Sequence, residues 1–298
     1  MSGVTSNDAS DPTAAVVSLT SAPSLATTFA RAVATSRGRS GDELPGTAYE
    51  LSVTVDRDRL ADYQRLCGFA VGDVLPPTYP HVLGFPLQAH LMADRRFPLA
   101  LPGLVHLANE ITVARPLLAG ETLLVTVSAA DLRPHPKGRL VDLLTSADVD
   151  GERFWSGRST YLQRGSGSAD ADPGSLGPSV PDGPVVARWR LPSDLGRRYA
   201  AVSGDVNPIH LSSLTARAMG FPRAIAHGMW TYARTLAALG PATDVGTSQV
   251  WFRKPVLLPS TVALTVDRRA EGTTAGLTSA KDPSIEHLAV QSSPRIAT

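Results

Sequence analysis

The sequence repeats itself across a Gly- and Pro-rich segment, and this repeat constrains the fold more than any other feature. Two short motifs recur 136 positions later in the same order (199 − 63 and 220 − 84). The matched pairs are Tyr63-x4-Gly68 with Tyr199-x4-Gly204, and Gly84-Phe85-Pro86 with Gly220-Phe221-Pro222. Further on, ITVARPLLAGETLLVTV resembles VWFRKPVLLPSTVALTV, with Pro116 aligned on Pro255. The shared order predicts a duplicated structural unit, and the alternative is two units that share turn chemistry without common descent.

Residues 165–184 divide the two copies. The segment reads GSGSADADPGSLGPSVPDGP and carries almost no large apolar side chain, a composition typical of a linker. We therefore expect one domain at 46–164 and a second at 185–298. Residues 1–45 are expected to form a mobile tail that contains one short helix at 24–36.

Each copy follows the same order of elements: a strand, then helices, then a run of alternating strands. This order favours a helix wrapped by a curved antiparallel sheet, an α+β fold, over a repeated strand–helix–strand unit. The first copy is predicted to have strands at 47–56, 107–115, 121–132, 140–150 and 154–162 and a helix at 58–67. The second is predicted to have helices at 193–202, 207–219 and 229–239 and strands at 184–191, 247–254, 260–268, 272–279 and 285–291.

Charge and cysteine content exclude several classes of protein. Lys and Arg number 28 against 27 for Asp and Glu, a balance that gives no reason to expect nucleic acid or an anionic membrane as partner. No apolar run reaches the ~18 residues of a membrane span. One cysteine, Cys67, rules out a disulfide framework and favours the cytoplasm, and its apolar neighbours predict a buried, inert thiol. No glycine-rich nucleotide fingerprint is present.

Residues 199–230 carry the chemistry. Asn207-Pro208 is a helix-start signal, with His210 in the first turn and Asp205 just upstream, so the two side chains can converge near the helix entrance. A carboxylate and an imidazole that share one water can take and return a proton. The alternative is an Asp205 that only binds turn amides and a His210 on the surface.

A second feature lies at His227-Gly228, just before the apolar helix expected at 229–239. The N–H groups at a helix start lack partners and face a positive dipole end, so Gly228 can bind a carbonyl oxygen on which negative charge builds. A glycine kept for packing is the competing interpretation. His227 is interpreted as a structural or pocket-lining residue and not as a second base.

Taken together, these motifs resemble the MaoC-like (R)-specific enoyl-thioester hydratases. The matching residues are Tyr199, Ser203-Gly204-Asp205, Asn207-Pro208-Ile209-His210 and Ala226-His227-Gly228-Met229. The two-copy layout past residue 45 resembles the double hot-dog members of that family, as does PLALPGLVHLANEI at 98–111. The resemblance implies an α+β double hot-dog fold, in which only one half keeps the catalytic pair.

The resemblance also implies an activity: reversible hydration of trans-2-enoyl thioesters to (3R)-hydroxyacyl thioesters in lipid metabolism. Asp205 would act as general base, His210 would share the proton, and the Gly228 amide would polarise the carbonyl. Ser203, Asn207, His227 and Met229 are expected to contact substrate, which is carried by coenzyme A or acyl-carrier protein. No metal or redox cofactor is expected, and the chain is expected to be a monomer or homodimer.

The first copy lacks the catalytic pair. At an offset of 136 residues, Asp205 falls on Phe69 and His210 on Val74. The resemblance implies that this half makes room for a long acyl chain, with its own central helix beginning near His90-Leu91.

Other interpretations stay open. Arg253 and Lys254 either meet a phosphate of the carrier or form a solvated face. The same fold also suits an acyl thioesterase, and a non-catalytic acyl-binding subunit is a third hypothesis. The intact Asp205/His210 spacing favours hydration.

Overall fold

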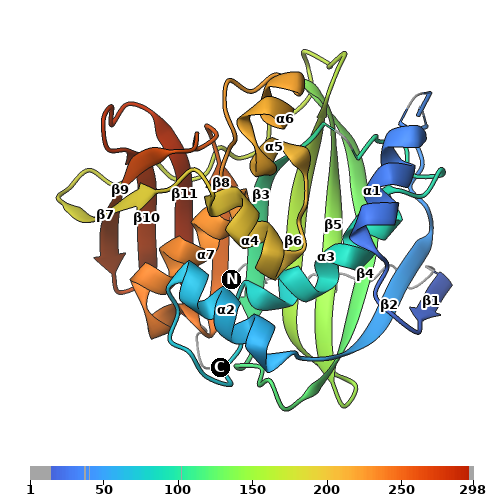
Figure 1. The fold of residues 1–298 in the computed structure, drawn as a ribbon, viewed down its shortest axis with the longest axis horizontal. Coiled ribbons are helices and arrows are strands. Elements are labelled where there is room, and N and C mark those ends of the chain that lie inside the picture. The colour runs from blue at the N-terminus through green and yellow to red at the C-terminus, as the bar shows by residue number, and fades with distance from the viewer. Residues whose placement is uncertain (1–14, 37, 40, 102, 295–298) are drawn as a thin grey trace, which may run out of the picture.

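One continuous eleven-stranded sheet runs through the molecule (Figure 1). The computed structural model describes residues 15–294 except 37, 40 and 102. The strand order is β1-β2-β4-β5-β6-β3-β8-β11-β10-β9-β7. The strands are β1 (Ala15–Leu19), β2 (Thr47–Thr54), β3 (Leu104–Val113), β4 (Thr122–His135), β5 (Gly138–Val149), β6 (Glu152–Arg164), β7 (Val185–Leu191), β8 (Gly246–Phe252), β9 (Ser260–Arg269), β10 (Gly272–Ser279) and β11 (Glu286–Ser293).

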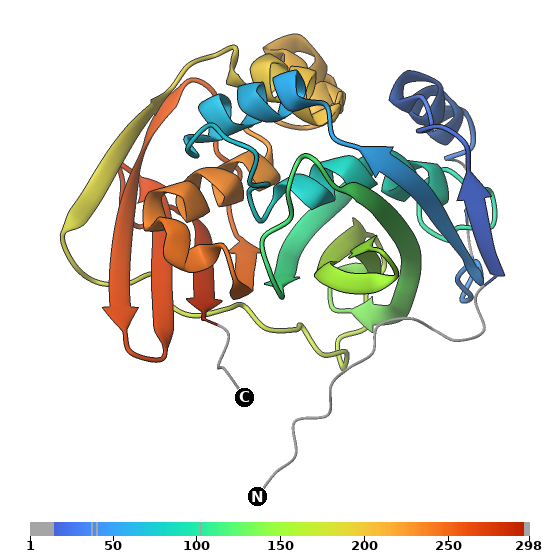
Figure 2. The ribbon, with the colours of Figure 1, turned by 90° about the horizontal axis from the view of Figure 1, so that it is seen from below.

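The helices lie on one side of this sheet, which bends around the two central ones, α3 and α7 (Figure 2). The helices are α1 (Leu25–Ala34), α2 (Arg57–Cys67), α3 (Tyr79–Met92), α4 (Leu195–Ser203), α5 (Pro208–Leu211), α6 (Ser213–Ala218), α7 (Gly228–Leu239) and the short 3-10 turn η1 (Pro241–Thr243). None of the helices in the described ranges is long and apolar enough to cross a membrane.

The two halves repeat one topology. Strands β2-β4-β5-β6-β3 in the first half correspond in order to β7-β9-β10-β11-β8 in the second, and β3 pairs with β8 antiparallel at the centre. Two helix ends also correspond, because Gly68 closes α2 and Gly204 closes α4, both in the left-handed region (φ 83° and 79°). The buried rings of Tyr63 and Tyr199 lie 6.0 Å apart. These matches confirm the duplicated unit that the repeat predicted and the α+β double hot-dog architecture that the resemblance implied.

The Gly-Phe-Pro match is wrong as a structural equivalence. Residues 84–86 lie inside α3, whereas 220–222 lie in the loop after α6. The triplet therefore does not mark a shared turn, and its matching offset does not reflect equivalent positions in the two halves.

The expectation that the first central helix begins near His90 is also wrong. Helix α3 begins at Tyr79, and His90 lies in its last turn. Pro86 lies inside this helix. Because proline normally breaks a helix, the sequence predicted a loop up to residue 85. Ten of its residues are nevertheless buried, since α3 packs on β4 and β5, and this tertiary contact overrides the local signal.

Two segments expected to be irregular are more ordered than their composition suggested. Within the predicted tail, β1 pairs in parallel with β2, while residues 1–14 lie outside the described residues. The segment 165–184 forms no helix or strand, yet it packs on the sheet: Gly177 lies against Trp251, and Arg253 donates hydrogen bonds to the carbonyls of Leu176 and Pro178. We call residues 173–180 the strap.

Gly84 tests how closely α3 must approach the sheet. A Cβ at this position would lie 2.7 Å from Thr145 Cγ2, too close for van der Waals contact. We expect Gly84→Val to destabilise the fold by about 1–3 kcal/mol, the usual cost of overpacking. Gly46→Val is the matched control, because no atom lies within 4 Å of a Cβ there. Thermal unfolding measures both, and equal melting temperatures would show that α3 shifts freely.

Candidate active site

The turn between α4 and α5 positions Asp205 by local hydrogen bonds. Ser203 Oγ accepts from the Asp205 N–H at 3.1 Å and donates to the Tyr199 carbonyl at 2.8 Å. The Asp205 carboxylate accepts from the Asn207 N–H at 3.1 Å, and Asn207 caps α5. The hydrogen bonds to Ser203 Oγ and to one carboxylate oxygen of Asp205 fix the backbone of the turn and the orientation of the carboxylate. The second carboxylate oxygen of Asp205 takes no part in these hydrogen bonds.

His210 is held from the opposite side of the turn. Its Nδ1–H donates to the Ile225 carbonyl at 2.9 Å, and the Ile225 N–H donates to the Ile209 carbonyl. Because Nδ1 carries the proton, Nε2 keeps its lone pair. The predicted helix at 207–219 is in fact two short helices, since Ser212 is extended (φ −153°) and caps α6. That break turns the chain back so that Ile225 reaches His210.

His227 completes a compact trio with Asp205 and His210. The two imidazole rings are stacked, with centroids 3.7 Å apart and planes 26° apart. His227 Nε2–H donates to the Asp205 carbonyl at 3.0 Å and lies 3.8 Å from the Asp205 carboxylate. His227 therefore touches both members of the pair and fixes their separation.

Burial shapes the proton affinities of these groups. Burial raises the pKa of Asp205, an effect that the charge of His210 and the Asn207 amide oppose. Burial lowers the pKa of His210, against the attraction of the Asp205 carboxylate. The pKa of His227 lies well below its ordinary value, first because of burial and then because of His210. A more basic carboxylate beside a more acidic imidazolium is suited to passing a proton between them.

Gly228 is the first residue of α7, directly after His227. Its N–H has no acceptor among the described residues, as expected at a helix start. A Cβ here would lie 3.0 Å from the Phe252 ring, so glycine also lets this ring pack closely against the start of α7. Gly196 on α4 similarly allows the His210 carbonyl to approach closely. Gly196 and Phe252 carried no sequence signal, since each acts only through a neighbour that is distant along the chain.

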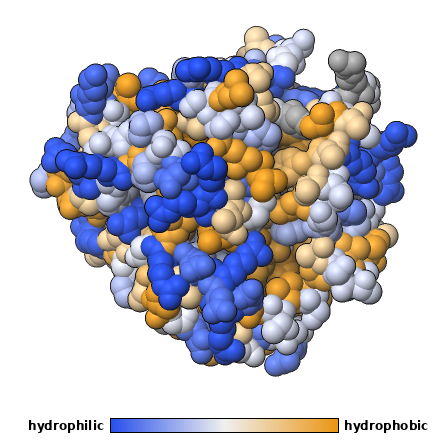
Figure 3. Space-filling view, in the orientation of Figure 1, coloured by the Kyte–Doolittle hydropathy of each residue, from blue (hydrophilic) through white to orange (hydrophobic). Residues whose placement is uncertain are grey.

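One large cavity of about 1130 Å³ gathers these residues. It is lined by all seven sequence-predicted site residues, which are Ser203, Asp205, Asn207, His210, His227, Gly228 and Met229. The cavity continues into the first half, along α3 and β3, as far as Phe29 on α1. On the face drawn in Figure 3, apolar side chains gather toward the middle of the molecule.

Among the described residues of the first half, no side chain takes the place of His210. The short bridges Val74↔Leu118 and Ile225↔Leu257 occupy equivalent places before the central helices, so Val74 corresponds to Ile225 and not to His210 as the fixed offset predicted. The chain from Gly68 to Val74 is short, whereas that from Gly204 to Ile225 holds α5 and α6. The excursion that carries the histidine is therefore absent from the first half.

The trio is also the one group of His, Cys, Asp or Glu residues, within the described ranges, whose ligand atoms lie close enough for a metal, all within 4.8 Å. The donor geometry fits a metal poorly. Imidazole lone pairs lie in the ring plane, and two stacked rings point them side by side instead of toward one centre. His227 Nε2 and His210 Nδ1 are moreover occupied by carbonyls.

Arg253 is not available to bind a phosphate. It forms an ion pair with Glu286 and holds the strap through two carbonyls. Lys254 lines the same cavity without an ion pair in the part of the chain that the structure describes. The predicted basic pair therefore divides into one structural arginine and one lysine at the cavity.

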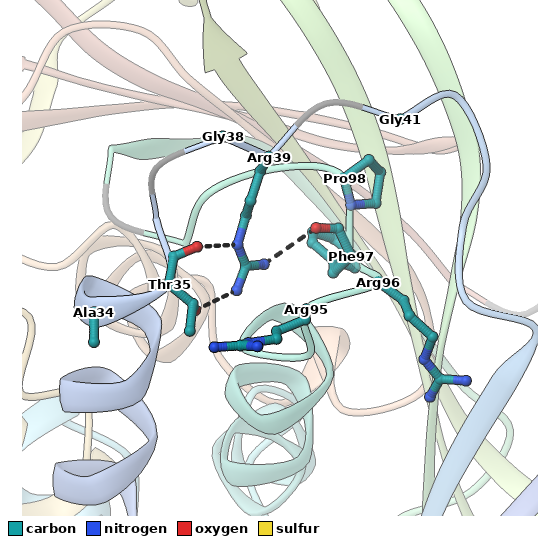
Figure 4. A pocket seen from close by; sticks show the side chains of 9 residues that line it. All are labelled: Ala34, Thr35, Gly38, Arg39, Gly41, Arg95, Arg96, Phe97 and Pro98. Atoms are coloured by element: carbon teal, nitrogen blue, oxygen red, sulfur yellow. Dashed lines mark hydrogen bonds between the residues drawn. The ribbon is translucent and has the colours of Figure 1, made fainter.

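A second, smaller pocket of about 320 Å³ lies at the end of α1 (Figure 4). Arg39 fills its centre and donates to the carbonyls of Thr35, Met92, Phe97 and other neighbours. These bonds tie the loop after α1 to the end of α3. The pocket is a structural clamp, since its central cation is already satisfied by backbone oxygens.

Comparison with known proteins gives consistent matches. Residues 184–281 match the description "MaoC like domain", and residues 61–152 match "FAS1-like, dehydratase domain region". The chain is 39% identical over 236 residues to 3-hydroxyacyl-thioester dehydratase X of Mycobacterium tuberculosis, covering 78% of this chain and 82% of that protein.

Solved structures agree. The crystal structure of HtdX of Mycobacterium tuberculosis superposes with a TM-score of 0.73 at 34% identity, covering 82% of this chain and 98% of that one. A Mycobacterium tuberculosis protein described as a double hot-dog fold matches at 14% identity with a TM-score of 0.54, covering 81% and 92% of the two chains, a likeness of fold alone.

The coupling between Asp205 and His210 can be measured directly. We expect His210 to titrate below the ordinary histidine value of about 6.5. In Asp205→Asn its pKa should fall further, because the carboxylate charge that favours the imidazolium is gone. Ring nitrogen chemical shifts followed against pH measure this. Asp244→Asn, a part-buried aspartate outside the cavity, should leave His210 unchanged. An unchanged or raised His210 pKa in Asp205→Asn would contradict the coupling.

Proposed function

The chain belongs to the MaoC-like 3-hydroxyacyl-thioester dehydratases, and from that premise we propose that it catalyses the reversible addition of water to a trans-2-enoyl thioester. The product is a (3R)-hydroxyacyl thioester, and the reverse reaction is its dehydration in fatty-acid or related lipid metabolism. One observation carries the proposal: Asp205 and His210 converge on the cavity beside the unpaired amide of Gly228.

Each group has a defined task. Asp205 takes a proton from a water whose oxygen adds to C3 of the substrate, and the electron pair of the double bond moves toward the carbonyl oxygen. The Gly228 N–H donates a hydrogen bond to that oxygen as its negative charge grows. His210 Nε2 receives the proton from Asp205 and delivers it to C2, so one water is added and both residues return to their starting state.

Neighbouring residues keep this geometry. Ser203 and Asn207 use their oxygens to fix the turn that carries Asp205, and His227 holds the Asp205 carbonyl while it stacks on His210. Met229 lines the cavity one residue after Gly228. We assign the first three to positioning and Met229 to substrate contact. The steps need only proton transfers, so we propose that no metal or redox cofactor takes part.

The first half supplies the space for the acyl chain. The cavity there is lined by large apolar side chains from α1, α3 and the start of β3, including Phe29, Val82, Phe85, Met92 and Leu104. We call this part of the cavity the apolar arm. Three basic side chains, Lys137, Arg164 and Lys254, also line the cavity. We propose that the acyl chain enters the apolar arm and that coenzyme A or acyl-carrier protein approaches from the basic end.

All the residues named above come from one chain, which supports the proposal that the protein can act as a monomer or as a homodimer. The single cysteine is buried and its thiol pKa is raised by burial, which fits a protein of the reducing cytoplasm.

Removal of either catalytic group tests the proposal. We expect Asp205→Asn and His210→Gln each to lower turnover of an enoyl-CoA by about 10²-fold or more, the usual contribution of a general acid or base. Loss of enoyl absorbance measures the rate. Asp244→Asn and His90→Gln are matched controls, because neither residue lines the cavity. Near-normal turnover in both folded site variants would overturn the assignment, and release of free thiol from saturated acyl-CoA would indicate a thioesterase.

The rate should also depend on pH through Asp205. The carboxylate is the active form, so kcat/KM falls as the pH drops through the pKa of Asp205, which burial raises. The midpoint of this acid limb is expected above the usual aspartate value of about 3.9. Initial rates at low substrate concentration give the profile, with circular dichroism at each pH to verify folding. A flat profile through pH 4 to 6 would exclude Asp205 as the base.

A further inference from the structure

Two histidines line the apolar arm of the cavity and are not part of the Asp205–His210–His227 trio. His81 comes from the first turn of α3, and His106 comes from β3. Their rings are nearly parallel, with planes 18° apart and centroids separated by 6.1 Å. Both line the cavity, next to Phe85 and Tyr161.

One polar atom of this pair is buried without a partner. The Nε2 atom of His106 has no hydrogen-bond partner among the described residues, while a backbone hydrogen bond at Ala108 engages the same ring. His81 is 5% exposed, and its ring forms no hydrogen bond with any described residue. A buried polar group without a partner destabilises the protein. A buried, unpaired nitrogen beside a second histidine, among mostly apolar side chains, indicates that a polar group satisfies it when the cavity is filled.

Both rings are neutral at ordinary pH. Burial lowers the pKa of His81 to about 4, and burial together with His81 lowers that of His106 to about 3. A neutral imidazole offers one N–H donor and one lone-pair acceptor. The pair therefore suits an uncharged group that both donates and accepts a hydrogen bond. Two neutral imidazoles do not compensate the charge of a buried cation or anion, so they do not favour a charged group.

The position of the pair relates it to the reaction centre. A Cβ on Gly228 would lie 3.0 Å from the Phe252 ring, and that ring lies 5.1 Å from the His106 ring. Tyr161 stacks on His106 with ring centroids 4.5 Å apart, and burial and then the charge of Asp205 raise the pKa of Tyr161. Phe252 therefore lies between Gly228 and His106, and a substrate whose carbonyl meets the Gly228 amide and whose acyl chain enters the apolar arm passes the two imidazoles.

We propose that His81 and His106 form a subsite for a hydroxyl group on the acyl chain, several carbons beyond C3. This inference rests on the proposed hydratase function and names its substrate class: enoyl thioesters whose chain carries a second oxygen. A hydroxyl can donate to one imidazole and accept from the other, a keto oxygen can only accept, and a methylene leaves both imidazoles unpaired. The order of preference is therefore hydroxyl, then keto, then unsubstituted chain.

The test compares trans-2-enoyl-CoA substrates of one length that carry a hydroxyl at successive carbons, with the unsubstituted chain as reference. We expect one position at which kcat/KM exceeds the reference by about tenfold or more, because sites built to bind a hydroxyl discriminate against analogues that lack it. In His81→Phe and His106→Phe this ratio should fall toward one. His90→Phe is the matched control, since it lies on the same helix outside the cavity and should keep the wild-type ratio.

Outcomes separate this inference from the proposed function. Equal kcat/KM for all chains in a wild-type enzyme that hydrates them would mean that waters satisfy the imidazoles, and would overturn the subsite alone. Absence of hydration on every chain would overturn the hydratase. In that case calorimetric binding of saturated hydroxyacyl-CoA and plain acyl-CoA still decides the subsite, by whether the hydroxyl strengthens binding in wild type and not in His81→Phe. A preference that survives both histidine substitutions would also overturn it.

Discussion

The antiparallel pairing of β3 with β8 is the interaction on which the rest of the structure depends. It joins the edge strand of one half of the sheet to the corresponding edge strand of the other half, from Ala108↔Trp251 to Val113↔Gly246. Without it each half would end in an exposed sheet edge, with unpaired backbone groups. The register also brings His106 from the first half beside Phe252 from the second. The cavity therefore spans the junction because the sheet does.

Much of this fold could be predicted from sequence, because alternation along strands and the two Tyr-x4-Gly segments follow from local chemistry. The failures have a common cause. Because of Pro86, the first two turns of α3 were not predicted. The single helix predicted at 207–219 is divided at Ser212 into α5 and α6. In both places tertiary contacts decide the conformation: α3 is enclosed by the sheet, and the break at Ser212 returns the chain to the Ile225–His210 bond.

The candidate site shows a similar division. Asp205, His210 and Gly228 were found because capping residues and a helix start place them locally. The stacking of His227 on His210, the close approach at Gly196 and the pair His81–His106 join segments far apart in the chain, and no short-range pattern encodes such contacts. A fixed offset also misaligned Val74 with His210, since the halves differ by the insertion that contains α5 and α6.

The insertion that contains α5 and α6 makes the two halves of the molecule different. Because both halves lie in one chain, each half has its own sequence. In an assembly of two identical subunits, every substitution appears in both subunits. A substitution that widens the cavity in one subunit therefore also changes the same position in the other subunit. Here the half that holds α3 and the half that holds α5 are encoded separately. Substitutions can therefore change the cavity lining around His81 and His106 while the turn at Asp205 stays the same.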